Sequence, residues 1–220
     1  MWHAALRVTE KPFTTPNKFR VLPNVALVGS VDGEARVAAI RRAVTTKGMY
    51  LADLVGRLDD RHVEEVWPSL QEPPRHRKYQ PFLDYPFADA LRWLHAVARY
   101  QYPNSALLEG LRRLGRDTVK VFLASRTGQV VREMNLGPRE ALLRMPAMWR
   151  VTDPSAKVTA TELGPSEVHF EVRGFPGWID CGLIGTLEQV VLSRDAEPEI
   201  DVVLFGAEHG AFTVRVGAAL

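Results

Sequence analysis

The spacing of apolar residues changes near residue 150, and this change decides the fold class. Before it, apolar residues recur every three or four positions, as on one face of a helix; Val37, Ile40 and Val44 begin the pattern. After it, apolar and polar residues alternate, as they do along a half-buried strand. We therefore predict a single α+β domain, residues 1–220, in which an N-terminal multi-helix layer precedes a small antiparallel sheet.

The predicted sheet part, residues 151–220, contains two hairpins separated by one helix. Each hairpin turn contains Gly, and Asp180 is placed to cap the helix, which runs to about Leu192. The order is β-β-α-β-β, with the helix across one face of the sheet. The expected strands are residues 158–163, 168–173, 201–205 and 212–216.

The predicted helical part, residues 31–150, follows a proline-bearing arm, residues 1–30. The arm is expected to be irregular, or at most to contribute one strand. Helix starts are marked by Pro86 and Ser105, and Pro146 is expected to end a helix because it cannot donate the next backbone hydrogen bond. The main expected helices are residues 86–100, 105–135 and 139–145.

Charge divides the chain at the same place. Residues 1–150 hold 24 Lys and Arg against 15 Asp and Glu, whereas residues 151–220 hold 4 against 11. Complementary charge predicts that the two parts dock on each other or on a second copy. Arg112, Arg116 and Lys120 recur every four positions on one helix, a stripe that we interpret as a solvated face. Binding of nucleic acid through this stripe and residues 75–78 is an alternative that we do not expect, because no reader motif accompanies it.

Several classes of site are excluded by what the sequence lacks. Cys181 is the only cysteine, so no internal disulfide or multi-thiolate metal site can form. The six histidines have no metal-ligand spacing, and no glycine-rich phosphate-binding pattern occurs. No apolar run reaches the roughly 20 residues of a membrane span, and no secretory signal is recognisable. We expect a cytoplasmic protein with no membrane span, no bound metal and no cofactor.

Four residues are the candidates for a ligand site. Trp149, Phe175 and Trp178 are large apolar groups beside Gly and Pro, where a concave pocket or a dimer contact can form; packing in the core is the alternative. Cys181 would lie at the first position of the helix capped by Asp180, where unpaired backbone N–H groups lower the pKa of a thiol. We favour a small buried residue over a nucleophile at Cys181, because no partner base is evident.

Short stretches of the last two thirds of the chain form an ordered set. They include Leu-Arg-Arg-Leu-Gly-Arg-Asp-Thr-Val at residues 111–119 and Leu-Gly-Pro-Arg-Glu-Ala-Leu-Leu-Arg-Met-Pro-Ala-Met-Trp at residues 136–149. The others are Gly128, residues 158–165, Phe-Pro-Gly-Trp at residues 175–178 and Gly-Leu-Ile-Gly-Thr-Leu at residues 182–187. In this order they resemble a large paralogous family of uncharacterised proteins found in myxobacteria.

The order of elements also resembles the fold shared by the four-vinyl-reductase domain, the haem nitric-oxide-binding domain and the TRAPP trafficking subunits. This resemblance implies small-molecule sensing or dimeric scaffolding, although fold alone does not fix function. It also makes His95 a position to consider as an axial haem ligand. The Tyr-x-Ser-x-Arg motif by which the haem-binding relatives hold the propionates is missing, so we expect His95 to be a satisfied histidine at the edge of an apolar face.

These observations favour a non-enzymatic module with a regulatory or sensory role. It would bind a small apolar or aromatic molecule, or a protein partner, and work as a homodimer. One alternative is an enzyme that uses Cys181 or an unrecognised acid/base pair, which would require a cleft and a strongly shifted pKa. The other is nucleic-acid binding through the basic helical part.

Overall fold

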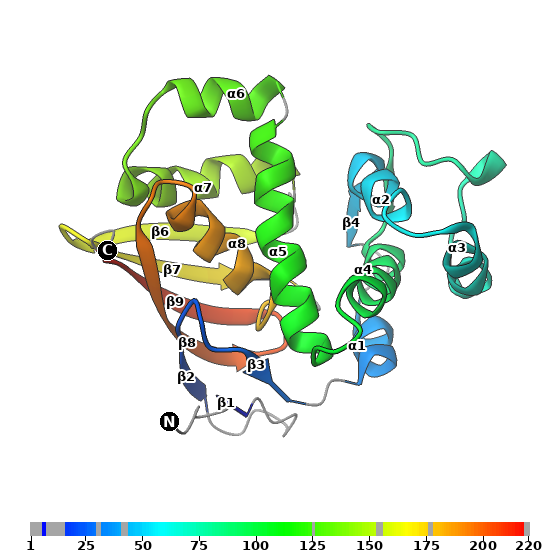
Figure 1. The fold of residues 1–220 in the computed structure, drawn as a ribbon, viewed down its shortest axis with the longest axis horizontal. Helices are drawn as coiled ribbons and strands as arrows, with labels where there is room; N and C mark the ends of the chain where they lie inside the picture. Colours follow the sequence, from blue (N-terminus) through cyan, green and yellow to red (C-terminus); the bar gives the residue numbers. More distant parts are fainter. Residues whose placement is uncertain are drawn as a thin grey trace.

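The computed structural model describes residues 6–7, 16–29, 32–40, 44–124, 126–152, 156–175 and 178–217. Its architecture is the predicted α+β arrangement (Figure 1). One face of a five-strand antiparallel sheet carries α7 (Pro138–Thr152) and α8 (Gly182–Leu192), and α5 (Leu107–Ala124) packs along α8. The first helices of the chain lie on the other side of α5 (Figure 1).

Both predicted hairpins are present in the sheet, and a fifth strand comes from the N-terminal arm. The strand order is β2-β8-β9-β7-β6, and every neighbouring pair is antiparallel. Val168, Phe170 and Val172 alternate with polar residues and are buried, because successive side chains of a strand point to opposite faces. The strands are β2 (Asn17–Val21), β6 (Lys157–Gly164), β7 (Glu167–Arg173), β8 (Glu197–Gly206) and β9 (His209–Gly217). Two short pairs complete the strands: β1 (Leu6–Arg7) with β3 (Leu27–Val28), and β4 (Thr45–Lys47) with β5 (Asp84–Pro86).

The helical layer is centred on α4 (Phe87–Gln101), which is buried around most of its circumference. Its buried Asp89 accepts the backbone N–H groups of Gln71 at 2.7 Å and Glu72 at 3.0 Å. The polar loop at residues 71–78 is therefore anchored at its start. Around α4 lie α1 (Gly33–Ala39), α2 (Gly48–Val55) and α3 (Asp60–Val66), with the short 3-10 turns η1 (Trp67–Ser69) and η2 (Arg75–Arg77).

Two of the three main expected helices differ from the structure, one in being divided and one in where it ends. The helix expected at residues 105–135 is two helices, α5 and α6 (Arg126–Glu133), which run in different directions (Figure 1). A Cβ on Gly128 would lie 2.0 Å from the Phe122 carbonyl oxygen, so glycine allows this close return of the chain. The helix expected to end at Pro146 continues to Thr152. Leu142 and Met145 of α7 are buried, and this packing offsets the hydrogen bond that proline cannot donate.

Glycines bring α5 and α8 into backbone contact. A Cβ on Gly115 would lie 1.9 Å from the Gly182 carbonyl oxygen, and one on Gly185 would lie 1.8 Å from the Arg112 carbonyl oxygen. No other residue type fits at these two positions without separating the helices. Gly115 and Gly185 therefore allow the close contact of α5 with α8.

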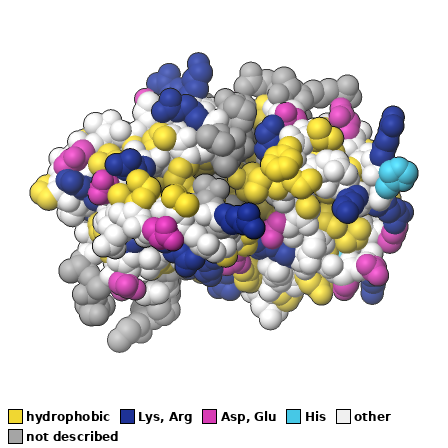
Figure 2. Space-filling view, turned by 90° about the horizontal axis from the view of Figure 1, so that it is seen from above, with side chains coloured by type: hydrophobic (Ala, Val, Ile, Leu, Met, Phe, Trp, Pro, Cys, Tyr) yellow, Lys and Arg dark blue, Asp and Glu magenta, His cyan; other side chains and the backbone are white. Residues whose placement is uncertain are grey.

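Basic residues of the first part of the chain form ion pairs with acidic residues of the second part. On the surface, basic and acidic side chains lie intermingled, and the visible face is not divided into a basic and an acidic side (Figure 2). Asp180, expected as a helix cap, accepts from the guanidinium of Arg36 on α1 at 2.8 Å, and Cys181 takes the N-cap position of α8 without a side-chain cap bond. This ion pair joins the helical layer to the sheet part.

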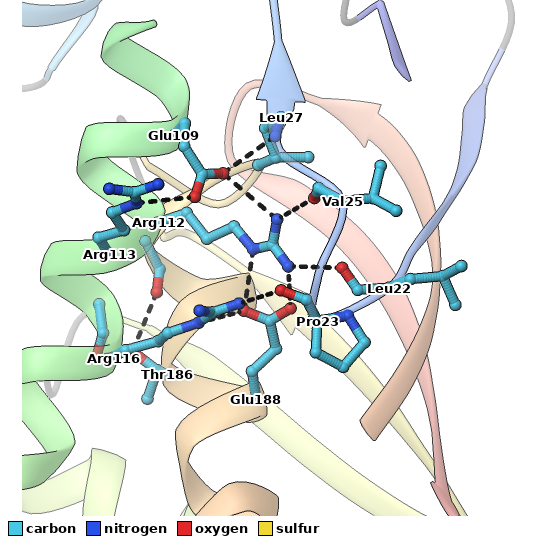
Figure 3. Close-up of polar contacts among 12 residues, drawn as sticks. Leu22, Pro23, Val25, Leu27, Glu109, Arg112, Arg113, Arg116, Thr186 and Glu188 are labelled. Atoms are coloured by element: carbon cyan, nitrogen blue, oxygen red, sulfur yellow. Dashed lines mark hydrogen bonds and ion pairs between the residues drawn. The ribbon is translucent and has the colours of Figure 1, made fainter. Parts of the chain in front are cut away.

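A second junction is a buried charge cluster between α5, α8 and the strap, the segment of residues 22–27 (Figure 3). The side chain of Arg112 is 0% exposed and bonds both carboxylate oxygens of Glu188, with Nε donating to Oε2 at 2.9 Å. Its two terminal nitrogens donate to the carbonyl oxygens of Val25 at 2.6 Å and Leu22 at 2.9 Å. Arg116 donates to Glu188 as well, at 2.9 Å. The interpretation of this stripe as a solvated face is therefore wrong at Arg112 and Arg116.

Replacing Arg112 with Met should lower the free energy of unfolding by about 3–5 kcal/mol, because it leaves Glu188 buried with only Arg116 and removes two bonds to the strap. Urea unfolding followed by circular dichroism measures this. The matched control is Arg61→Met, since the Arg61 side chain is 84% exposed and its ion pair with Glu65 should contribute far less. Equal losses in the two variants would contradict the importance given to the buried pair.

Candidate functional site

Two adjoining apolar hollows lie where the helical layer meets the sheet part. The larger, about 190 Å³, lies between α2, α4, α5 and the aromatic residues that precede α8. The smaller, about 110 Å³, lies between α5, α6, α7 and α8. The two hollows are neighbours, because both are lined by Tyr50, Thr118, Phe122, Trp149 and Thr186.

Three of the four candidate residues meet at the wall of the larger hollow. The ring centroids of Trp149 and Phe175 lie 6.1 Å apart, and those of Phe175 and Trp178 lie 6.2 Å apart with nearly parallel planes. The Trp178 ring lies directly over Gly182, where a Cβ would come within 2.0 Å of it. The chain therefore brings a helix end, a strand end and a turn together into one aromatic wall.

Cys181, the fourth candidate, is buried beside this wall but lines neither hollow in the described part of the chain. Its Sγ lies 3.6 Å from the Trp178 carbonyl oxygen. Burial, together with the nearby Asp180 carboxylate, raises the pKa of the Cys181 thiol well above its ordinary value. The thiolate that nucleophilic chemistry requires is thus disfavoured.

The sequence did not single out the residues that complete the hollow. Thr118 and Phe122 lie on the apolar side of α5, and Ala90 and Leu94 face them from α4. In the sequence they have the spacing of ordinary core residues. Only the three-dimensional arrangement shows that their side chains line the larger hollow.

The rim of the larger hollow carries exposed apolar side chains. Met49 is 49% exposed, and Val121 on the opposite wall is also exposed. Figure 2 shows apolar side chains gathered along the middle of this face. An apolar molecule would therefore meet an apolar surface on its way into the hollow.

His95 lies on α4 but lines neither hollow in the described residues. It is buried against α1, where a Cβ on Gly33 would be only 2.8 Å from its Nδ1, and its Nε2 finds no hydrogen-bond partner among the residues that the structure describes. The expectation of a satisfied histidine at the edge is wrong, because the neighbouring α1 covers that edge. Burial and the nearby guanidinium groups of Arg99, Arg36 and Arg92 lower the pKa of His95 to about 4.

Among the residues that the structure describes, no group of three or more His, Cys, Asp or Glu side chains is arranged to hold a metal ion. In the same part of the chain, no helix combines the length and the apolar character that crossing a membrane requires.

Comparisons with known proteins place the chain in a family and identify its fold. The family model described as protein of unknown function DUF2378 matches residues 39–215. No curated protein matches.

Among solved structures, the Fe(II) unliganded H-NOX protein from K. algicida is similar at a TM-score of 0.62 and 14% identity, covering 79% of this chain and 98% of that one. A point mutant of T. tengcongensis H-NOX gives a TM-score of 0.59 and 15% identity, covering 79% and 96%. A structure that probes haem distortion in the H-NOX family gives 0.60 and 17%, covering 79% and 95%. At these identities the likeness concerns the fold, which is that of the H-NOX proteins.

Acidification should test the buried state of His95. The unfolded chain binds a proton at this side chain near pH 6.5, whereas the folded protein binds it only near pH 4. The free energy of unfolding should therefore fall by roughly 3 kcal/mol as the pH is lowered from about 6.5 to 4, and His95 should add no further slope below that. Urea unfolding across this window should show a smaller decrease for His95→Gln. Parallel curves for the two proteins would mean that His95 is not held neutral.

Proposed function

We propose that this chain, which belongs to the DUF2378 family of proteins of unknown function, is a non-enzymatic module that binds a small apolar or aromatic molecule and acts in regulation or sensing. The ligand would occupy the hollow walled by Trp149, Phe175 and Trp178. The observation that carries this proposal is the pair of adjoining apolar hollows between the helical layer and the sheet part.

The size of the hollow limits the ligand. An apolar cavity of about 150 Å³ in another protein stays dry and takes up benzene. The larger hollow here has about 190 Å³ and adjoins a further 110 Å³. A ligand of one or two fused rings fits this space, with its faces against the aromatic wall.

The polar groups in the wall favour a neutral ligand. The Thr118 hydroxyl donates to the Leu114 carbonyl oxygen at 3.0 Å, and the Thr186 hydroxyl donates to that of Gly182 at 3.0 Å. Asp53 pairs with Arg57 at 2.7 Å. Since these groups are already engaged, affinity would come mainly from burial of apolar surface.

Haem, which the likeness to H-NOX proteins raises as a candidate, does not fit the lining. Histidine, cysteine, methionine and tyrosine are the usual protein ligands of haem iron. In the described part of the chain no histidine or cysteine lines either hollow. Methionine and tyrosine do line them, but Arg194 is the one cation in the described walls for two propionates. The two hollows, about 190 Å³ and 110 Å³, are also small for a porphyrin, since about 150 Å³ is the size of a cavity that takes a single benzene ring. The proposal therefore assigns an organic ligand other than haem.

The alternatives have less support. The raised pKa of Cys181 opposes its use as a nucleophile. Of the three cations of this stripe only Lys120 is largely exposed, so the stripe offers little to the extended backbone of a nucleic acid. We also propose self-association as a homodimer or docking of a protein partner, because exposed apolar side chains lie near the rim. Phe82 is 86% exposed, and the backbone bonds of Gly48 to Leu83 and Met49 to Pro81 hold its loop beside α2.

Native mass spectrometry of the purified protein tests the ligand and the copy number together. We expect a mass above that of the polypeptide from a co-purified molecule, or from added indole, in the wild type. Ala90→Phe should abolish this adduct, because Ala90 lines the larger hollow and a phenyl ring would fill it.

The matched control is Ala207→Phe, which adds the same ring to an exposed turn. It should retain the adduct with the affinity of the wild type. Indole binding that is equal in Ala90→Phe and wild type would refute the hollow as the site. Absence of any adduct, with and without indole, would refute the ligand-binding proposal.

A further inference from the structure

A third hollow lies on α5, on the side away from the apolar hollows, and it is polar. It has a volume of about 420 Å³ and lies between α5, Tyr102 and the strap. Three cations line it: Arg113, Arg116 and Lys120. Its size falls within the roughly 300–1,000 Å³ of small-molecule sites.

The polar hollow is separate from the proposed apolar site. Arg116 and Lys120 each lie two residues from Thr118, which lines both apolar hollows. Two residues correspond to roughly 200° around an α-helix, so these side chains project from opposite sides of α5. One helix thus forms a wall of two unlike sites.

The cations of the polar hollow keep unused hydrogen-bond donors. Arg113 donates through Nε to Glu109 at 3.0 Å, and its guanidinium lies 5.3 Å from the centre of the Tyr102 ring. Arg116 uses Nε for Glu188 and Nη2 for the Pro23 carbonyl oxygen. Among the described residues, Nη1 and Nη2 of Arg113 and Nη1 of Arg116 have no hydrogen-bond partner, and Lys120 has one.

The two carboxylates in the wall are already neutralised. Glu109 accepts from Arg112, Arg113 and the backbone N–H of Leu27. Asp117 accepts from the Tyr102 hydroxyl at 2.8 Å and from Lys120 at 3.0 Å. Burial, with the Asp117 contact, raises the pKa of Tyr102 to about 12, so this hydroxyl remains a donor at neutral pH.

The charge of the whole cluster remains positive. Four cations, those of the polar hollow and Arg112, are in contact with three carboxylates, since Glu188 joins Glu109 and Asp117. An incoming anion therefore meets net positive charge and donors that need not give up their present partners.

We infer that the polar hollow binds a small polyanion, a molecule with two or more phosphate or carboxylate groups. Guanidinium groups match both kinds of anion through paired N–H donors, and Lys120 adds a mobile point charge at the rim, with its side chain 59% exposed. Such a ligand would bridge α5 to the strap, because Pro23, Asn24, Val25 and Ala26 form the facing wall. Figure 3 shows Pro23 and Val25 of the strap across from Arg113 and Arg116 of α5.

Isothermal titration calorimetry with inorganic pyrophosphate and, separately, citrate tests this inference at low salt. We expect saturable binding of one molecule per chain for at least one of them, weakened by added NaCl. Arg113→Gln/Lys120→Gln should weaken it at least tenfold. Pyrophosphate preference would assign phosphate ligands, and citrate preference would assign carboxylates.

The matched control is Arg61→Gln/Lys157→Gln, which removes two exposed cations on α3 and β6 and should leave the affinity unchanged. If the first double variant does not fold, Lys120→Gln alone serves, because its bond to Asp117 is an exposed one. The inference is overturned if neither anion binds, or if both double variants bind as the wild type does. These readouts do not depend on indole, so the two proposals stand or fall separately.

Discussion

The pairing of Arg112 with Glu188 is the interaction on which the arrangement of the molecule depends. A guanidinium that is fully removed from water must have its charge matched and its donors satisfied. Here the match comes from α8 and the remaining bonds come from carbonyl oxygens of the strap. Helix α5 is thereby fixed in rotation and in depth against two segments that are distant in sequence.

The glycine contacts reinforce this constraint. Gly115 and Gly185 remove the side chains that would otherwise hold α5 and α8 apart, so the charged groups can reach each other. The excess of basic residues in the first part of the chain and of acidic residues in the second part is then explained by contacts within one molecule. Arg36 with Asp180 and Arg112 with Glu188 both cross between the parts.

Local sequence patterns were sufficient for the fold class and for most elements, because hairpins and amphipathic helices are recorded in residue spacing. These patterns failed where contacts between segments distant in sequence determine the surroundings of a residue. Arg112 and Arg116 would have the same spacing on a solvated face as on one that contacts Glu188. Asp180 precedes α8 as a capping residue would, but its carboxylate pairs with Arg36 instead. Trp149, Phe175 and Trp178 were recognisable from their Gly and Pro neighbours, whereas Thr118 and the strap required knowledge of which surfaces face each other.

We interpret α5 as a rigid wall between an apolar and a polar hollow, held in place by its buried charges. Hydrogen–deuterium exchange of the native protein, read by mass spectrometry, tests it most directly. We predict that amides of residues 111–119 exchange only through global unfolding, while those of the largely exposed α6 exchange through local opening. Exchange of residues 111–119 at the rate of α6 would contradict it.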